Sequence, residues 1–236
     1  ALSFSTDGNY IAVGRADQKI EIWSIKSGLL VQVIKTNKNE VYSLGYLTKN
    51  ELIAGHIGRI NTWNPNNGEM MRSLKIPNKI NSSDPKSNLI KEIKVSNGKK
   101  IALIQNTKVF TVDFETFKVS STFSGHKSGV RSIAFSVDGK TLATSGQDKV
   151  IYLWNFAEGT EHKLNGHSLP VNSVDFHPDG KRLLSGSEDR KLLVWDLLNS
   201  SNDQAFGQAE DNNWVDLSVS KANSVNAGNG MSIFDF

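Results

Sequence analysis

Residues 130–140 read Val-Arg-Ser-Ile-Ala-Phe-Ser-Val-Asp-Gly-Lys, and residues 171–181 read Val-Asn-Ser-Val-Asp-Phe-His-Pro-Asp-Gly-Lys. Each stretch is followed by a tail that ends in Trp, at residues 149–154 and again at residues 190–195. This repetition indicates two copies of one structural unit, set 41 residues apart. A period of this length is typical of stacked repeat architectures, and it decides the fold before any local pattern does.

Fainter copies of the unit appear when the last apolar anchor of each tail is aligned. The steps between successive anchors are 40, 49, 42, 41 and 39 residues, and the anchors are Trp23, Trp63, Val112 in place of an aromatic residue, Trp154, Trp195 and Phe234. The sequence therefore predicts six units. A polar insertion at residues 78–88 accounts for most of the longest step.

Within a unit, apolar residues alternate with a period of two, and the pattern breaks at Asn-Gly or Asp-Gly pairs such as Asp138-Gly139 and Asp179-Gly180. These pairs readily supply the positive φ angles of tight hairpin turns. No segment shows a sustained helical period. Each unit is thus predicted to supply about four short strands, and one such sheet has to stack on its neighbours to bury both faces.

The composition agrees with a globular chain and removes several kinds of chemistry. Of 236 residues, 38% are hydrophobic and 22% are charged, and 27 Lys and Arg residues against 24 Asp and Glu residues leave a net charge of +3. This charge is too small to identify a nucleic-acid partner. The absence of cysteine excludes disulfides, thiolate metal sites and cysteine nucleophiles. No apolar run approaches the roughly 20 residues of a membrane span, so we expect a soluble protein.

The two best units carry a further set of shared residues. They are Gly125-His126, Asp148 and Trp154 in one unit, and Gly166-His167, Asp189 and Trp195 in the next. This arrangement resembles consecutive repeats of the WD-repeat β-propeller family. The resemblance extends more loosely over the whole chain, because the second unit has Gly58 near the Asp position and the third has Val112 in place of Trp.

The resemblance implies an all-β fold, a β-propeller with six blades visible in one domain at residues 1–236. The expected blades are residues 1–35, 36–77, 89–124, 125–164, 165–206 and 207–236. Seven blades are the commonest number in the family, so we expect this chain to be part of a seven-bladed ring, with a six-bladed ring as the alternative. The chain is then an excerpt that begins on an innermost strand and lacks the outer strand of its last blade.

A His, a hydroxyl residue and an Asp occur together in both of the best units, which raises the possibility of a hydrolase. The family resemblance implies a structural role instead, in which each set joins its Trp in a hydrogen-bonded tetrad. The two tetrads are His126, Thr144, Asp148 and Trp154, and His167, Ser185, Asp189 and Trp195. We expect no catalytic residue, because neither set has a nucleophile-elbow signature.

The remaining histidines do not predict a metal site. His56, His162 and His177 are separated in the sequence and lack the spacing of zinc ligands, so we interpret them as solvated or capping residues. No glycine-rich stretch has the ending of a phosphate-binding loop. We therefore expect neither a metal nor a cofactor.

By resemblance, the loops that precede the first strand of each blade belong to a face that docks protein partners. The positions expected on that face are Arg131, Asn172, Gln147, Glu188, Tyr42 and Lys91. The leading hypothesis is a non-enzymatic scaffold in a larger complex, located in the cytoplasm or nucleus. The alternatives are a nucleic-acid-associated propeller in ribosome assembly or RNA processing, suggested by the pI of 8.9, and a propeller enzyme.

Overall fold

The computed structural model describes residues 1–36, 40–77, 85–96 and 100–197, and these residues fold into five antiparallel β-sheets. Sheet 1 contains β1 (Leu2–Phe4), β2 (Tyr10–Gly14), β3 (Lys19–Ser24) and β4 (Leu30–Lys35). Sheet 2 contains β5 (Ser43–Thr48), β6 (Glu51–Gly55), β7 (Arg59–Trp63) and β8 (Met70–Lys75).

The later sheets repeat this pattern. Sheet 3 follows a short 3-10 helix, η1 (Pro85–Asn88), and contains β9 (Ile90–Ser96), β10 (Lys100–Gln105), β11 (Lys108–Asp113) and β12 (Val119–Phe123). Sheet 4 contains β13 (Val130–Phe135), β14 (Thr141–Gly146), β15 (Ile151–Asn155) and β16 (Thr160–Leu164). Sheet 5 contains β17 (Val171–Phe176), β18 (Arg182–Ser187) and β19 (Leu192–Asp196). The all-β fold class is thereby confirmed.

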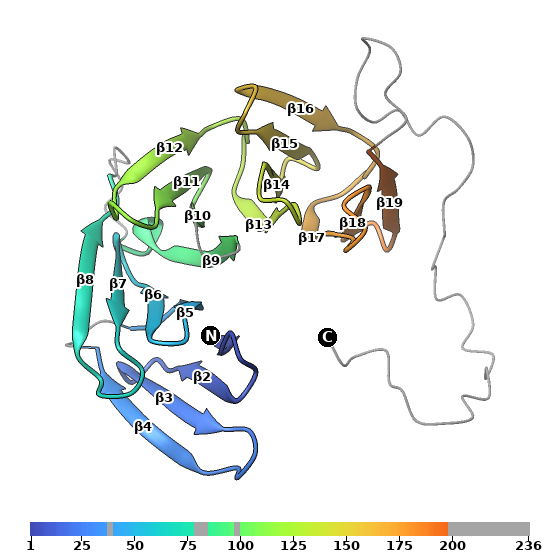
Figure 1. Ribbon diagram of the computed structural model, residues 1–236. Helices are drawn as coiled ribbons and strands as arrows, with labels where there is room; N and C mark the ends of the chain where they lie inside the picture. The colour runs from blue at the N-terminus through green and yellow to red at the C-terminus, as the bar shows by residue number, and fades with distance from the viewer. Residues whose placement is uncertain (37–39, 78–84, 97–99, 198–236) are drawn as a thin grey trace, which may run out of the picture.

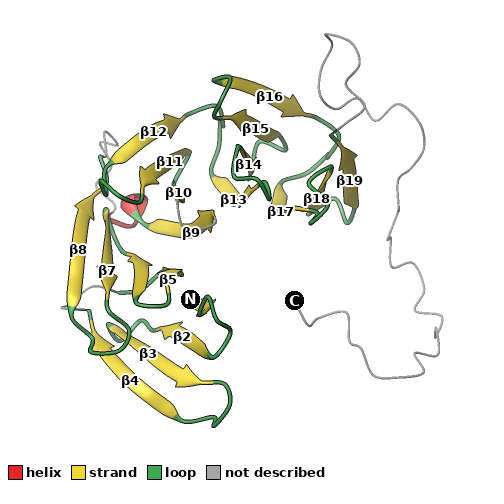
Figure 2. Cartoon of the chain, in the orientation of Figure 1, coloured by secondary structure: helices red, strands yellow, loops and turns green. Residues whose placement is uncertain are grey.

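The five sheets follow one another along an arc in chain order (Figure 1). The strands β5, β9, β13 and β17 line its inner side, and β4, β8, β12 and β16 lie on the outer side (Figure 2). This is the arrangement of propeller blades. The predicted sixth blade at residues 207–236 lies outside the described residues, so the blade boundaries and the seven-bladed ring stay predictions.

The topology assigns every turn to one of two faces. Each sheet is a meander of antiparallel neighbours, so the chain reverses direction at every turn. The turns between second and third strands therefore lie at the same end as the connections from one sheet to the next. We call this end the tetrad face, because the connections that carry His126 and His167 lie there. The remaining turns form the opposite face.

The core consists of four apolar clusters, each shared by two neighbouring sheets. The strand β10 shows how one sheet serves two clusters. Ile101 and Leu103 pack in the cluster shared with sheet 2, and Ala102 and Ile104 pack in the cluster shared with sheet 4. All four side chains are fully buried. Because successive side chains of a strand point to opposite faces, an uninterrupted apolar run is what a blade inside a stack requires.

The first turn of sheet 4 is stabilised by an aspartate. In sheet 4, the Oδ1 atom of Asp138 accepts hydrogen bonds from the Ser136 hydroxyl at 2.6 Å and from the Lys140 backbone N–H at 3.0 Å. The next residue, Gly139, has a φ of 67°, which glycine adopts without steric cost. The Asp-Gly pairs predicted as turns therefore form turns here. Within the described part of the chain, no helix is long and apolar enough to span a bilayer.

Candidate functional site

The first tetrad joins the connection before sheet 4 to the strands of that sheet. His126 Nδ1 lies 2.9 Å from Asp148 Oδ1, and His126 Nε2 lies 2.8 Å from Thr144 Oγ1. The indole N–H of Trp154 donates to the same Thr144 oxygen at 3.1 Å. The second Asp148 oxygen accepts the backbone N–H of Lys127 at 2.9 Å. The chain that enters sheet 4 is therefore fastened at two successive residues.

Sheet 5 carries the same arrangement. His167 Nδ1 lies 2.9 Å from Asp189 Oδ2, and His167 Nε2 lies 2.8 Å from Ser185 Oγ. Trp195 donates its indole N–H to Ser185 Oγ at 2.8 Å, and the Ser168 backbone N–H donates to Asp189 at 2.9 Å. The structure thus brings together all eight residues that the resemblance named as tetrad members.

The carboxylate of Asp189 is held in its ionised form. Burial alone would raise the pKa of Asp189, but hydrogen bonds from His167 and from the backbone N–H groups of Ser168 and Lys191 outweigh it and lower the pKa. A carboxylate with several fixed donors is stabilised in this way. The aspartate therefore acts as a charged acceptor that organises the surrounding loop.

The geometry of the two sets does not suit nucleophilic catalysis. The Thr144 and Ser185 side chains are 0% and 1% exposed, and each hydroxyl oxygen lies between an imidazole and an indole N–H. A nucleophile has to reach the reacting atom of a substrate. These hydroxyls are enclosed by their own partners, so the sets serve as structural joints.

A glycine makes space for the tetrad in sheet 4. A Cβ atom on Gly146 would lie 2.5 Å from His126 Nδ1 and 2.7 Å from Asp148 Oδ1. Both distances are far shorter than a carbon contact allows. The His126 ring can therefore reach into the sheet from the connection only because Gly146 has no side chain.

Sheet 2 has a histidine where sheet 4 has this glycine. Leu52 pairs with Trp63 as Leu142 pairs with Trp154, and counting on from these pairs places His56 at the position of Gly146. The His56 ring packs edge-on against Trp63 with ring centroids 5.5 Å apart. Its Nδ1 lies 2.8 Å from the backbone oxygen of Glu40, in the connection that enters sheet 2. In sheet 2, therefore, the histidine follows β6 and bonds the connection, whereas in sheet 4 the histidine belongs to the connection itself.

Of the two interpretations of His56, as a solvated or a capping residue, the solvated alternative is wrong, because the His56 side chain is fully buried. Burial lowers the pKa of His56, with a smaller opposing contribution from the Glu40 hydrogen bond. The neutral ring is then favoured, with the proton on Nδ1 donated to the Glu40 carbonyl. The spacing along the sequence did not reveal this role, because the partner is a backbone atom 16 residues earlier.

Three of the residues predicted to face a partner form one cluster on the tetrad face. Arg131 Nη1 donates to Asn172 Oδ1 at 3.0 Å and lies 3.2 Å from Glu188 Oε1. Arg131 and Asn172 occupy the same position in the neighbouring inner strands β13 and β17, and Glu188 lies in the turn between β18 and β19. We call these three residues the rim cluster. It joins sheets 4 and 5.

The other predicted face residues belong to the same face but are not members of the rim cluster. Gln147 is exposed in the turn before β15, where its backbone N–H donates to the Gly129 oxygen at 2.9 Å. Lys91 is exposed on β9, one residue after the start of the strand. Tyr42 is half-buried, and its hydroxyl donates to the Glu40 carboxylate.

A pocket on the opposite face escaped the sequence analysis. It has a volume of about 550 Å³ and lies between sheets 4 and 5. Its walls include Val137 and Asp138 from one first turn, Pro178 and Asp179 from the next, and Phe176. Because the lining comes from two repeats, no single motif marks it. Within the described residues, no group of three or more His, Asp or Glu side chains is arranged to hold a metal ion.

Comparison with known proteins agrees with the repeats seen in the fold. The family model of the WD domain, G-beta repeat, matches residues 1–24, 117–155 and 159–196. The last two matches contain both tetrads. The first match covers β1 to β3 of sheet 1.

Individual relatives are similar over two thirds of the chain. WD repeat-containing protein SL1-17 of Schistosoma mansoni is 27% identical over 162 residues, which are 67% of this chain and 51% of that protein. Protein HIRA of Zea mays is 30% identical over 67% of this chain and 14% of its own length. WD repeat-containing protein 36 of Homo sapiens is 24% identical over 67% of this chain and 17% of its length.

The chain thus spans about half of the Schistosoma relative and under a fifth of the other two. Two of these three relatives are named as WD repeat-containing proteins. With repeats that match the family model, sheets arranged as blades and two complete tetrads, this chain belongs to the WD-repeat family.

Proposed function

We propose that this chain is a non-enzymatic scaffold whose tetrad face docks a protein partner beside the inner strands of sheets 4 and 5. The observation that carries the proposal is the rim cluster, in which Arg131 is held between Asn172 and Glu188. Asn172 and Glu188 are exposed, so their free hydrogen-bonding atoms face solvent. Arg is a favoured anchor of protein interfaces.

The cluster is organised before any partner arrives. Both contacts of Arg131 are made by Nη1, and a guanidinium carries five N–H donors, so further donors remain to take a carboxylate or carbonyl of a partner. The tetrads beneath it fix the connections that enter sheets 4 and 5. A preorganised surface loses less conformational entropy on binding, which favours affinity.

The test compares the recovery of protein partners from the native cell extract by the parent and by variants of this face. Arg131→Gln removes the charge without placing a new carboxylate beside Glu188, which Arg131→Glu would do. Lys91→Glu and Gln147→Arg change exposed residues nearby. We expect each variant to keep the melting temperature of the parent within a few degrees and to recover less partner.

Lys140→Glu is the matched control for Lys91→Glu, because it makes the same charge change at an exposed residue on the opposite face. The control should recover partners as the parent does. Unchanged recovery with all three tetrad-face variants would reject this docking surface. A loss that is equal in the control would show that net charge, and no particular face, governs the recovery.

A further inference from the structure

The turns between second and third strands share one backbone geometry. Each of the five sheets has a residue with positive φ there, with angles from 56° to 70°, and these residues are Gln18, Gly58, Asn106, Lys149 and Arg190. The turns are therefore equivalent positions on the tetrad face, repeated from sheet to sheet. A residue type that recurs in them forms a regular feature of this surface.

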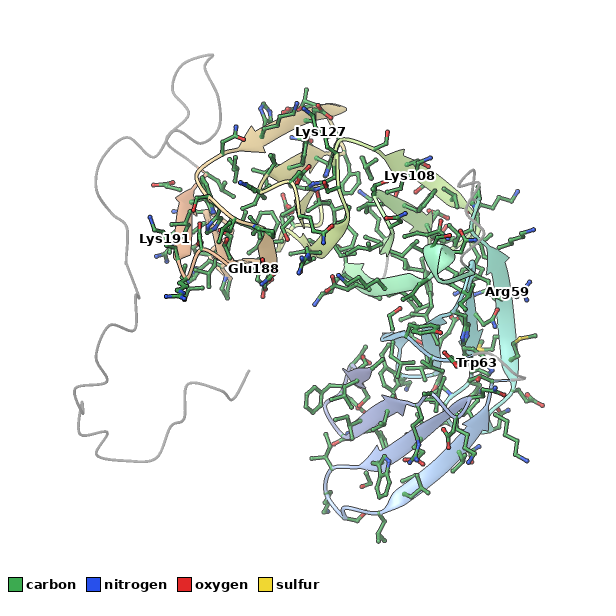
Figure 3. All side chains as sticks on the ribbon, turned by 180° about the vertical axis from the view of Figure 1, so that it is seen from behind. Arg59, Trp63, Lys108, Lys127, Glu188 and Lys191 are labelled. Carbon is green, nitrogen blue, oxygen red and sulfur yellow. The ribbon has the colours of Figure 1, made fainter. Side chains whose placement is uncertain are left out.

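A cation recurs in each of these turns or at the first residue of the strand that follows. The cations are Lys19 at the start of β3, Arg59 at the start of β7, Lys108 at the start of β11, Lys149 in the turn of sheet 4, and Arg190 with Lys191 in the turn of sheet 5. Arg59, Lys149, Arg190 and Lys191 are exposed, and Lys108 is half-buried. Figure 3 labels Arg59, Lys108 and Lys191, which follow one another along the arc of sheets with Lys127 beside them.

Sheet 1 neutralises its cations within the same turn. Arg15 lies 3.3 Å from Asp17 and 3.0 Å from Glu21, and Lys19 lies 3.1 Å from Asp17. Sheets 2 to 5 differ, because no ion pair is formed by the turn cations there among the described residues. We call Arg59, Lys108, Lys149, Arg190 and Lys191 the cationic arc.

The nearest carboxylates of this face are already engaged. Asp148 and Asp189 accept from the tetrad histidines and from backbone N–H groups, and Glu188 pairs with Arg131. Glu40 accepts the hydroxyl of Tyr42. The exposed ammonium and guanidinium groups of the arc are thus left to solvent and to any anionic ligand.

We propose that the cationic arc binds an acidic, extended segment of a protein partner. The proposal rests on the scaffold function and names the chemistry of its partner. Carboxylates spaced along an extended chain would meet cations that recur from sheet 2 to sheet 5, and opposite charges on two surfaces speed and orient their association. Binding of acidic motifs by clusters of basic residues is a common mode of peptide recognition.

The rings of this face favour an acidic polypeptide over a nucleic acid. Surfaces that bind single strands combine cations with exposed aromatic rings on which bases stack. Among the described turns between second and third strands, the one ring is that of His56, which is fully buried and cannot stack on a base.

The experiment measures fluorescence anisotropy of a labelled peptide made of repeated Glu-Gly units, with the matching Gln-Gly peptide and a short single-stranded RNA as the other probes. The purified parent is compared with a variant that combines Arg59→Glu, Lys108→Glu, Lys149→Glu and Arg190→Glu. The matched control combines Lys26→Glu, Lys49→Glu, Lys140→Glu and Lys181→Glu, which change exposed turn residues of the opposite face.

We expect the parent to bind the Glu-Gly peptide in preference to the Gln-Gly peptide. The arc variant should bind it about tenfold more weakly, since each exposed ion pair contributes little alone and four are lost together. The opposite-face control should bind as the parent does. Binding should weaken as salt is added, because exposed charges are screened. If the arc variant does not fold, the same four positions changed to Gln provide the comparison.

Three results would overturn the inference. Equal weakening in the arc variant and the control would indicate attraction by net charge alone. Tight binding of RNA with no binding of the Glu-Gly peptide would make the arc a nucleic-acid surface. Failure of the peptide to bind, while Lys91→Glu and Gln147→Arg still reduce partner recovery, would leave the scaffold function standing and remove its acidic partner.

Discussion

Sheets 4 and 2 each bond the connection that enters them through a histidine, but the histidine belongs to a different segment in each sheet. In sheet 4, a histidine of the connection reaches into the sheet, and Gly146 leaves space for its ring. In sheet 2, His56 stands at the position of this glycine and reaches out to the Glu40 carbonyl of the connection. In sheet 2 the imidazole packs against Trp63, and in sheet 4 the imidazole and the Trp154 indole share the Thr144 hydroxyl oxygen. The comparison shows that the bond between the connection and the sheet can be supplied by a side chain of either segment.

The largest effect is expected from removing the tetrad carboxylates. Asp148→Ala and Asp189→Ala each leave a buried histidine nitrogen and a backbone N–H without an acceptor, which costs about 1–3 kcal/mol of unfolding free energy apiece. The two sites belong to different sheets, so the double variant should lose roughly the sum. Urea unfolding measures the change. A loss below about 0.5 kcal/mol in both single variants would contradict the structural role of the tetrads.

An exchange at the shared position tests the comparison directly. Gly146→Ala places a Cβ atom against His126 and Asp148, and overpacking of this kind costs about 1–3 kcal/mol. His126→Ala alone also lowers the unfolding free energy, because it removes the imidazole that links the other members of the tetrad. The double variant should lose less than the sum of the single losses, since the clash with the ring disappears and only the contact with Asp148 remains. Additive losses in urea unfolding would show that Gly146 is needed for another reason.

The sequence could predict the parts of this arrangement that recur in register. His, Ser or Thr, Asp and Trp occupy equal positions in sheets 4 and 5, and the family resemblance that this repetition carried implied both tetrads. His56 could not be found in the same way, because its bond depends on how closely the connection passes the end of β6. The strands followed from alternation and from the Asp-Gly turns. The cationic arc was hidden, because its members become neighbours only when the blades stack.

A smaller effect concerns the pH dependence of sheet 2. Burial lowers the pKa of His56 in the folded protein, whereas an unfolded histidine titrates near 6.5. Below about pH 6.5 the unfolded chain therefore takes up a proton that the folded chain resists, so the stabilisation present above that pH is lost as the pH falls. His56→Gln removes this titration and keeps a hydrogen-bonding side chain.

The melting temperatures of the parent and of His56→Gln are compared at pH 7.5 and at pH 5.5. The melting temperature of the parent should fall more between pH 7.5 and pH 5.5 than that of the variant. The difference between the two falls is the contribution of His56, separated from that of the other titrating groups. His177→Gln is the control, because His177 is an exposed histidine beside Asp179. Equal losses in the parent and in His56→Gln would mean that the ring of His56 does not resist protonation.

The smallest effect is expected at the positive-φ position of the second turn, which is Gly58 in sheet 2 and Lys149 in sheet 4. A side chain in the left-handed region costs roughly 1–2 kcal/mol, so Lys149→Gly relieves strain. Glycine also gives the unfolded chain more freedom, which offsets roughly 0.5–1 kcal/mol of that relief. The unfolding free energy should therefore rise by no more than about 1.5 kcal/mol. Lys149→Gly keeps the backbone of the turn and removes its cation. Weaker binding of the Glu-Gly peptide by this variant would therefore arise from the lost charge. A large drop in stability would instead show that the Lys149 side chain supports the fold, and the arc would then have to be tested at Arg59, Arg190 and Lys191.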